Sequence, residues 1–450
     1  MAEPATAAPA RGISPARAVA LRVLRRVDGG AFADRALAGE ARKAGLDARE
    51  RAQAMRLAYG AVQRRRTLDW LIDAALDRPG ALEPAVRDVL RLGAYELAFA
   101  DGVPARAAVD QAVRQARALR GSGARASARA GLANAVLRRV AAEAAGRLAE
   151  LDRRGPAAAA LRHSMPDWIA DGLVASLGPA DAAAVMEAAS APAESALRWN
   201  PLRGPRATLE AALPAGWRRD EALAPEAYVL PGAFALEESE LWARGRAMAQ
   251  SRASQLVARA VAPAPGERII DLTAAPGAKT THIAALAHGG ARITAVELHP
   301  ARARALRATC ARMGARVDVV EGDAREVPLP DGVDAVLVDP PCTGTGVLAS
   351  RPDARWRRRP EALPALVELQ SELLARALRL VRPGGRVVYS TCSLLAAENE
   401  EVLAGAGAPL DDLAPLAPRA AHPALPGALR TLPHAHGTDG FVIARLRRTA

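Results

Sequence analysis

Apolar residues recur every three or four positions through the first third of the chain, which is the spacing of one buried helix face. Val19, Val23 and Val27 begin the pattern. The same spacing recurs over residues 57–76, 86–99, 109–119 and 132–140. We therefore expect an all-α domain of five to seven helices over residues 13–145, preceded by a disordered tail at residues 1–12.

A different pattern begins near residue 249, where short apolar runs alternate with amphipathic stretches. Strands are expected at residues 268–272, 292–296, 317–320, 335–338 and 386–389, and helices at 280–286, 301–313 and 361–380. Strands that alternate with helices form a parallel sheet with right-handed crossovers. The pattern therefore predicts an α/β, Rossmann-like domain over residues 246–450. Between the two domains, residues 146–245 are expected to form a linker near 156–160 and a small α+β segment.

Length and charge add to this picture. A single core stops growing at about 250–300 residues, so a chain of 450 residues is expected to contain more than one domain. The net charge is +12, and residues 1–145 contain 25 basic and 15 acidic side chains, which leaves the remainder nearly neutral. A basic helical domain favours RNA as a partner over the alternative of a solvated helix face.

Cysteine content and hydropathy indicate the cellular compartment in which the protein is expected to work. Cys310, Cys342 and Cys392 cannot all pair, which favours a reducing, cytoplasmic compartment. Cys310 falls on a predicted helix outside any motif and is expected to be a small buried residue. No apolar run approaches the roughly 20 residues of a membrane helix, and the N-terminus lacks a signal-peptide pattern. We expect a monomer with no membrane partner.

The first predicted strand of the α/β domain ends in a turn of small residues, which lets backbone amides approach a ligand. The turn consists of Thr273, Ala274, Ala275, Pro276, Gly277, Ala278 and Lys279. Thr273 and Ala278 stand where a phosphate loop requires glycine, and one glycine is too few for a dinucleotide fingerprint. S-adenosylmethionine does not require those glycines and is the expected cofactor. Lys279 is one of two lysines in a chain with 59 arginines.

Carboxylates and thiols follow the later predicted strands in order. Glu297 is placed to accept the ribose hydroxyls, and Asp323 to hold the adenine amino group. Asp339 and Cys342 follow the fourth strand, and Cys392 follows the fifth, at the edge where open α/β sheets bind ligands. No neighbouring Cys or His completes a zinc site, so we expect no metal.

Pyrimidine chemistry explains why a methyl transfer would use a thiol. Carbon 5 of cytosine is a poor nucleophile, but a thiolate that adds to carbon 6 converts the ring into an enamine. An acid near ring nitrogen 3 promotes the addition, and Asp339 is placed for this role. Amino-group methyltransferases carry an aromatic residue after a related Asp/Asn-Pro-Pro motif, whereas Cys342 stands here. The sequence therefore predicts methylation of a cytosine carbon.

Five blocks of sequence resemble the RNA cytosine-5 methyltransferases. They are Asp339-Pro-Pro-Cys-Thr-Gly-Thr-Gly-Val347, Arg351-Pro-Asp-Ala-Arg-Trp356, Tyr389-Ser-Thr-Cys-Ser393, Glu398-Asn-Glu400 and Gly437-Thr-Asp-Gly-Phe441. The helical N-terminal third resembles the NusB RNA-binding domain. The pairing of the two is similar to the RsmB (Sun, Fmu) group of 16S ribosomal RNA methyltransferases.

This resemblance implies that Cys392 is the nucleophile and that Cys342 assists release of the methylated product. It also implies a cofactor and base pocket lined by residues 273–279, Glu297, Asp323 and Asp339. The expected substrate is ribosomal RNA, of the small subunit. Transfer RNA as the substrate, and a non-catalytic RNA-binding or assembly factor, remain the alternatives.

Two departures from the family pattern accompany the resemblance. The family usually has Cys-Ala-Ala-Pro-Gly-Gly-Lys where this chain has Thr273 and Ala278, and Gln-Asp-Glu where Gln250-Ser251-Arg252 stands.

The arginine-rich stretch 351–359, which includes Trp356, has two interpretations. It either stacks on a base and neutralises phosphates, or docks its tryptophan on the protein.

Overall fold

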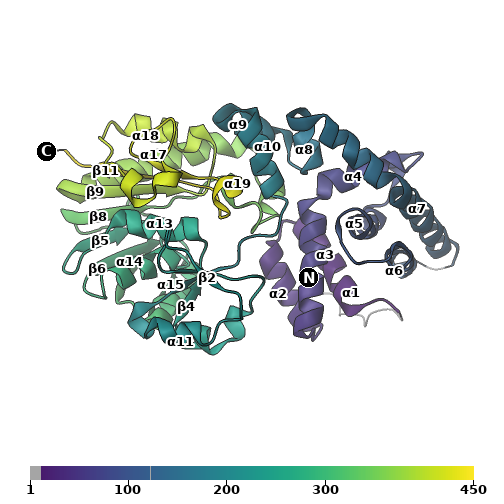
Figure 1. Ribbon diagram of the computed structural model, residues 1–450, viewed down its shortest axis with the longest axis horizontal. Helices are drawn as coiled ribbons and strands as arrows, with labels where there is room; N and C mark the ends of the chain where they lie inside the picture. Colours follow the sequence, from purple (N-terminus) through teal and green to yellow (C-terminus); the bar gives the residue numbers. More distant parts are fainter. Residues whose placement is uncertain (1–11, 122, 450) are drawn as a thin grey trace. The chain divides into compact units, whose positions relative to one another are not determined.

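The computed structural model describes residues 12–121 and 123–449, so the tail expected at residues 1–12 lies outside the described residues except for Gly12. The chain forms two compact units, and many of their helices and strands are labelled in Figure 1. The helical unit comprises the chain up to Val174 together with Gly178–Ala191 and Arg351–Arg357. The sheet unit comprises Ala175–Leu177, Pro192–Ser350 and the chain from Arg358 onward.

Amphipathic helices build the helical unit. Those in its described residues are α1 (Pro15–Asp28), α2 (Ala33–Lys43), α3 (Ala48–Gln63), α4 (Arg65–Ala74), α5 (Pro84–Phe99), α6 (Ala105–Arg117), α7 (Ala124–Arg153), α8 (Ala159–Arg162), α10 (Pro179–Ala188), α16 (Ala354–Arg357) and most of α9 (Asp167–Leu177). The Ser14 hydroxyl caps α1 by accepting from the Arg17 amide, and Pro15 occupies the first turn. The predicted all-α fold of the N-terminal region is confirmed.

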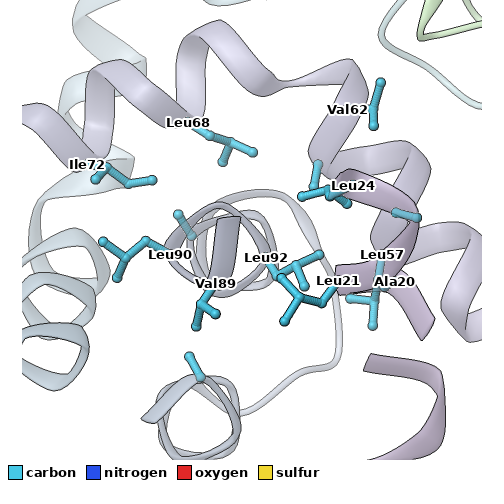
Figure 2. Packing of buried hydrophobic residues seen from close by; sticks show 14 of the residues in the cluster. Ala20, Leu21, Leu24, Leu57, Val62, Leu68, Ile72, Val89, Leu90 and Leu92 are labelled. Atoms are coloured by element: carbon cyan, nitrogen blue, oxygen red, sulfur yellow. The ribbon is translucent and has the colours of Figure 1, made fainter. Parts of the chain in front are cut away.

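The core of the helical unit lies around α5. The Val19, Val23 and Val27 face of α1 is buried in it, as the spacing predicted. In Figure 2, Leu90 of α5 points toward α4 and Leu92 points toward α1. Each such leucine contributes roughly 1.5–3 kcal/mol by its burial, so this apolar contact stabilises the unit more than any surface ion pair.

Two details of the helical region differ from the expectation. The single run expected over residues 57–76 is broken at Arg64, whose guanidinium donates to the carbonyls of Arg162 and Ser190. The linker expected near residues 156–160 is wrong, because a 3-10 turn at Gly155–Ala158 and α8 occupy this stretch. Ala158 and Ala159 are buried there, so the chain stays helical through these alanines.

The segment Arg351–Arg357 is built into the helical unit, far from it in sequence. Arg355 is fully buried and donates to the carbonyls of Gln63, His163, Ser164 and Ala189. Burial lowers its pKa to about 9. This side chain therefore binds protein backbone.

Trp356 docks beside it. Its indole N–H donates to the Val62 carbonyl at 2.7 Å, and the Arg65 guanidinium lies 5.5 Å from its ring centre. The ring packs against the core of the helical unit. The docking interpretation of the stretch therefore holds for Trp356.

The sheet unit is built on one large and one small sheet. Within the described residues the large sheet has seven strands in the order β10-β11-β9-β8-β5-β6-β7. They are β5 (Arg268–Asp271), β6 (Arg292–Glu297), β7 (Val317–Glu321), β8 (Val333–Val338), β9 (Val381–Thr391), β10 (Leu429–Thr431) and β11 (Phe441–Arg447). Strands β5 to β9 pair in parallel, whereas β11 pairs antiparallel with β9 and β10. The predicted Rossmann-like fold is confirmed, with an antiparallel edge that the pattern did not predict.

Helices cover both faces of the large sheet. One face carries α13 (Arg252–Val261), α14 (Ala278–Leu286) and α15 (Pro300–Met313), and the other carries α17 (Leu363–Leu380) and α18 (Glu400–Ala406). Neighbouring residues of β5 show the alternation, since Ile269 packs into the first layer and Ile270 into the second. Strand β5 lies between β8 and β6, so the order in which the strands follow one another in the sheet reverses at β5. Ligands of open α/β sheets bind outside the carboxyl ends of the strands at such a reversal.

The small sheet has the order β2-β3-β1-β4 and is antiparallel. Its strands are β1 (Ala196–Trp199), β2 (Arg218–Arg219), β3 (Ala227–Val229) and β4 (Ala247–Ala249), and the short helices α11 (Arg206–Glu210) and α12 (Glu240–Ala243) lie between them. Leu197, Tyr228 and Leu236 form its core. In the described part of the chain, no helix combines the length and the apolarity needed to span a bilayer.

Candidate active site

The carboxyl ends of four neighbouring strands are tied together by hydrogen bonds. The Ala274 amide donates to the Val296 carbonyl at 3.0 Å, and the Gly322 amide donates to the Glu297 carbonyl at 3.2 Å. The Asp339 amide donates to the Thr273 hydroxyl at 3.2 Å. The residues expected in the cofactor turn, after β6, after β7 and after β8 therefore lie along one edge of the sheet.

The turn after β5 leads directly into α14. Gly277 caps the helix with a φ of 104°, and a Cβ there would lie 2.8 Å from Cδ1 of Leu306, so this position requires glycine. Ala278, the departure from the family pattern, is half-buried at the first helical position. Its carbonyl accepts a hydrogen bond from the Arg198 guanidinium, which fixes the backbone at this position.

A buried carboxylate that the sequence reasoning did not select fixes the same turn. Asp271 accepts from the Thr273 amide at 3.3 Å and from the Thr280 hydroxyl at 2.6 Å, so it holds both ends of the turn. Burial raises the pKa of this carboxyl to about 6. Its position at the end of a buried strand was the signal in the sequence that could have revealed it.

Glu297 and Asp323 each have an arginine partner. Glu297 is buried at the end of β6, where it accepts from the His299 amide at 2.9 Å and lies 3.3 Å from Nε of Arg302. Asp323 binds Arg325 through both oxygens, and this arginine holds the pKa of Asp323 below its usual value. The two carboxylates lie on successive strand ends, as expected.

Asp339 is clamped through both of its oxygens. Lys279 donates to Oδ2 at 2.7 Å, and the Ser390 hydroxyl donates to Oδ1 at 2.9 Å. Burial lowers the pKa of Lys279, but the Asp339 carboxylate outweighs burial and raises it above its ordinary value. The Lys279 ammonium also lies 5.2 Å from the ring centre of Phe441 in the closing sequence block. The structure therefore pairs the unusual lysine with the expected acid.

The two cysteines of the sequence blocks meet at the ends of β8 and β9. Their Sγ atoms are 3.3 Å apart, and neither cysteine forms a disulfide. The bond with Cys392, together with burial, raises the pKa of Cys342 well above its ordinary value. Cys342 is therefore the protonated, buried partner, whereas Cys392 is partly exposed.

Cys310 lies apart from this pair, buried on α15. Burial raises the pKa of its thiol to about 11, so it is a neutral thiol. Across the described residues, no group of three or more His, Cys, Asp and Glu side chains is arranged to hold a metal ion.

Arg252, in the second departure from the family pattern, forms ion pairs with two acidic residues. It is buried between Glu194 and Asp220 and donates to the carbonyls of His436 and Gly437. It therefore anchors the start of the Gly437–Phe441 block, whose last residue lies beside Lys279.

The parallel sheet with an antiparallel edge, the turn after its central strand and the acids on the next strands define a Rossmann-like methyltransferase domain. Comparison with known proteins agrees with this assignment of a methyltransferase domain. Residues 258–447 match the family described as 16S rRNA methyltransferase RsmB/F, and residues 14–142 match the NusB family. The chain belongs to the RsmB/F family of 16S ribosomal RNA methyltransferases and carries a NusB-family domain.

Similar proteins extend over nearly the whole chain. The ribosomal RNA small subunit methyltransferase B of Thermus thermophilus is 33% identical over 96% of this chain and 97% of its own length. A protein of Mycobacterium tuberculosis named as a methyltransferase is 38% identical over 97% of both chains. The crystal structure of PH0851 superposes with a TM-score of 0.79 at 26% identity, covering 97% of this chain and 99% of the other.

Proposed function

We propose that this protein transfers a methyl group from S-adenosylmethionine to carbon 5 of a cytosine in small-subunit ribosomal RNA, with Cys392 as a covalent nucleophile. The observation that carries the proposal is the pair of thiols 3.3 Å apart beside the Lys279–Asp339 ion pair. The relatives named as ribosomal RNA small subunit methyltransferases support the substrate class.

S-adenosylmethionine supplies an electrophilic methyl group. The residues present fit it, because the buried carboxylate of Glu297 suits ribose hydroxyls and the turn 273–279 consists mostly of small residues at the start of a helix, which suits binding through backbone amides. Asp323 is the proposed partner of the adenine amino group, and this requires Arg325 to share or release its carboxylate.

The thiol pair divides the work on the cytosine ring. The sulfur of Cys392 forms a bond to carbon 6, and the ring electrons shift to carbon 5 as nitrogen 3 gains a proton. That proton leaves the Cys392 thiol and reaches nitrogen 3 through the Asp339 carboxylate, which the ammonium of Lys279 keeps in place. After carbon 5 has taken the methyl group and lost its proton, the Cys392 sulfur leaves carbon 6 and nitrogen 3 gives up the proton it had gained, which restores the ring.

Cys342 is the proposed acceptor of the carbon 5 proton, which makes it the residue that assists product release. The hydrogen bond with Cys392 is the largest cause of its raised pKa. Once the Cys392 sulfur is bound to carbon 6, this cause disappears and the pKa of Cys342 falls. The Cys342 thiol then loses its proton to solvent, and the resulting thiolate takes the proton from carbon 5. Each thiol thereby acts at a different step.

We also propose that the protein acts as a monomer in the cytoplasm. All of the proposed catalytic groups come from one chain, and none of the three cysteines forms a disulfide, as a reducing compartment favours.

Substitution of each thiol tests the chemistry. Cys392→Ala should abolish methylation, whereas Cys342→Ala should form the bond to carbon 6 and fail to release it. A covalent enzyme–RNA band on a denaturing gel after incubation with RNA and S-adenosylmethionine measures this. Cys310→Ala is the matched control and should behave like the wild type, because its thiol lies on α15 away from the pair.

Turnover by Cys392→Ala at the wild-type rate would contradict the proposal. Bisulfite sequencing of total RNA with and without the gene identifies the methylated base. If removal of the gene abolishes the 5-methylcytosine signal in transfer RNA instead of ribosomal RNA, the proposed chemistry stands and the proposed substrate is wrong. No binding of S-adenosylmethionine in calorimetry would favour a non-catalytic RNA-binding factor.

A further inference from the structure

Glu398 is a fully buried carboxylate whose partners, within the described residues, are all neutral donors. The Thr343 amide donates to Oε1 at 2.9 Å, the Gln370 side chain donates to Oε1 at 3.0 Å, and the Thr343 hydroxyl donates to Oε2. A buried charge is costly unless it is fully hydrogen-bonded. Three neutral donors offset this cost, and they tie the carboxylate to the loop that carries Cys342.

The groups that Glu398 holds lie on both sides of Cys342. Thr343 follows this cysteine directly, and the side chain of Gln370 that binds Glu398 also donates to the Pro341 carbonyl at 2.9 Å. Gln370 lies on α17 and is itself buried. The backbone before and after the Cys342 thiol is thus fixed to one carboxylate.

Asn399, the next residue, does the same for Cys392. Its Oδ1 accepts from the Thr391 hydroxyl at 2.6 Å, and its Nδ2 donates to the carbonyls of Ser393 and Leu395 at 3.1 and 2.9 Å. Thr391 and Ser393 flank Cys392. Asn399 is also fully buried, so water does not compete for these bonds.

Direct bonds join the two loops as well. The hydroxyls of Thr343 and Ser393 are 3.0 Å apart, and the Gly346 amide donates to the Cys392 carbonyl at 2.8 Å. The Tyr389 hydroxyl donates to the Glu398 carbonyl at 2.6 Å, which fixes the dipeptide to β9. The network leaves the thiol pair little freedom to separate.

We propose that Glu398 and Asn399 are positioning residues for the two thiols, with Glu398 holding the Cys342 loop and Asn399 holding the Cys392 turn. This inference rests on the proposed function for its catalytic meaning. The charge of Glu398 also contributes to the raised pKa of Cys342, as do Cys392 and Asp339. The dipeptide therefore fixes the distance between the thiols, and the charge of Glu398 adds to the rise in the pKa of Cys342 that the bond with Cys392 and burial cause.

The spacing of the thiols can be measured without any RNA. Phenylarsine oxide bridges two neighbouring thiols with loss of water, so its affinity reports whether they are held together. In a Cys310→Ala background, Glu398→Gln and Asn399→Asp should each weaken capture of the arsenical by about tenfold or more. Glu401→Gln, an exposed acid at the start of α18, is the matched control and should leave capture unchanged.

Methylation kinetics provide the second readout. Both positioning variants should lower kcat by about 10²-fold while the KM for RNA stays near the wild-type value, because a misplaced reacting group affects the chemical step. Glu398→Gln should also shift the pH dependence of alkylation of Cys342 to lower pH. Circular dichroism and thermal unfolding establish that each variant is folded.

If Glu398→Gln does not fold, Thr343→Val removes one donor to the same carboxylate and replaces it in both assays. Arsenical capture and kcat at wild-type levels in folded variants would overturn the inference. Absence of cytosine methylation by the wild-type enzyme would instead overturn the proposed function, and the arsenical result would still decide the positioning role.

Discussion

Several buried charged residues of this protein fix the backbone around them through hydrogen bonds. Arg198 and Arg355 are both fully buried, and burial lowers the pKa of each to about 9. Arg355 donates to four carbonyls, and Glu398 accepts from an amide and neutral side chains. A group of this kind is expensive to remove because its partners are left unsatisfied.

Asp271 gives a prediction of stability against pH. Its pKa is about 6 in the folded chain and 3.8 as the ordinary value, so the folded state holds the proton more tightly. The resulting cost to folding is absent below about pH 4, grows as the pH rises through 6, and approaches about 3 kcal/mol above it.

Asp271→Asn should therefore raise the free energy of unfolding at pH 8 and have a smaller effect at pH 4.5. The uncharged amide can accept from the Thr273 amide through its oxygen and donate its NH2 to the Thr280 hydroxyl. Urea unfolding at the two pH values measures the difference. Asp331→Asn, at an exposed position, should show no such dependence on pH. A variant less stable than the wild type at pH 8 would contradict the role of burial.

At the scale of elements, β1 of the small sheet supports the cofactor turn of the large one. Arg198 extends from β1 and donates to the Ala278 carbonyl, to the Thr281 hydroxyl at 2.9 Å and to Gln250 at 2.6 Å. These contacts fix the first turn of α14. The small sheet is thus a structural support for the turn 273–279.

Arg198→Met should weaken the binding of S-adenosylmethionine by about tenfold, because the turn loses two anchors while the volume of the side chain is largely kept. Calorimetric titration of the cofactor measures this. Arg218→Met, on the exposed edge strand β2, is the control and should bind as the wild type does. Unchanged affinity in a folded Arg198→Met protein would show that the turn holds its shape alone.

The sequence predicted the elements whose signals are local and missed those that depend on distant partners. The turn after β5 and the acids after β6 and β7 follow from strand order alone. The Glu398-Asn399 pair stood in a recognised block, but its partners Thr343 and Thr391 are joined to it only by folding. Arg355 binds backbone carbonyls, which every residue carries, so no pattern of side chains marks its acceptors.

At the scale of the whole molecule, the helical unit depends on a segment that lies after the sequence block of Cys342. Arg355→Met should destabilise the full-length protein locally, because four carbonyls lose their donor. Amide exchange measured by mass spectrometry should accelerate by about tenfold or more in the segments around Val62 and His163. Arg359→Met, at an exposed position outside the helical unit, is the control.

Equal exchange in the Arg355→Met and wild-type proteins would contradict a stabilising role for this arginine. Trp356→Ala offers an independent check, since it removes the hydrogen bond to the Val62 carbonyl and leaves Arg355 in place.

The place of Arg351–Arg357 also bears on how the protein folds during synthesis. A ribosome releases the chain from the N-terminus, and N-terminal domains generally fold first as they emerge. Here the helical unit is not complete when residue 191 has emerged, because Arg355 and Trp356 are still to be made. Its final packing therefore waits until residue 357 is free of the ribosome, by which time β5 to β8 and the Cys342 loop have also been synthesised. The nascent chain thus completes its N-terminal unit only after much of the catalytic sheet has been made.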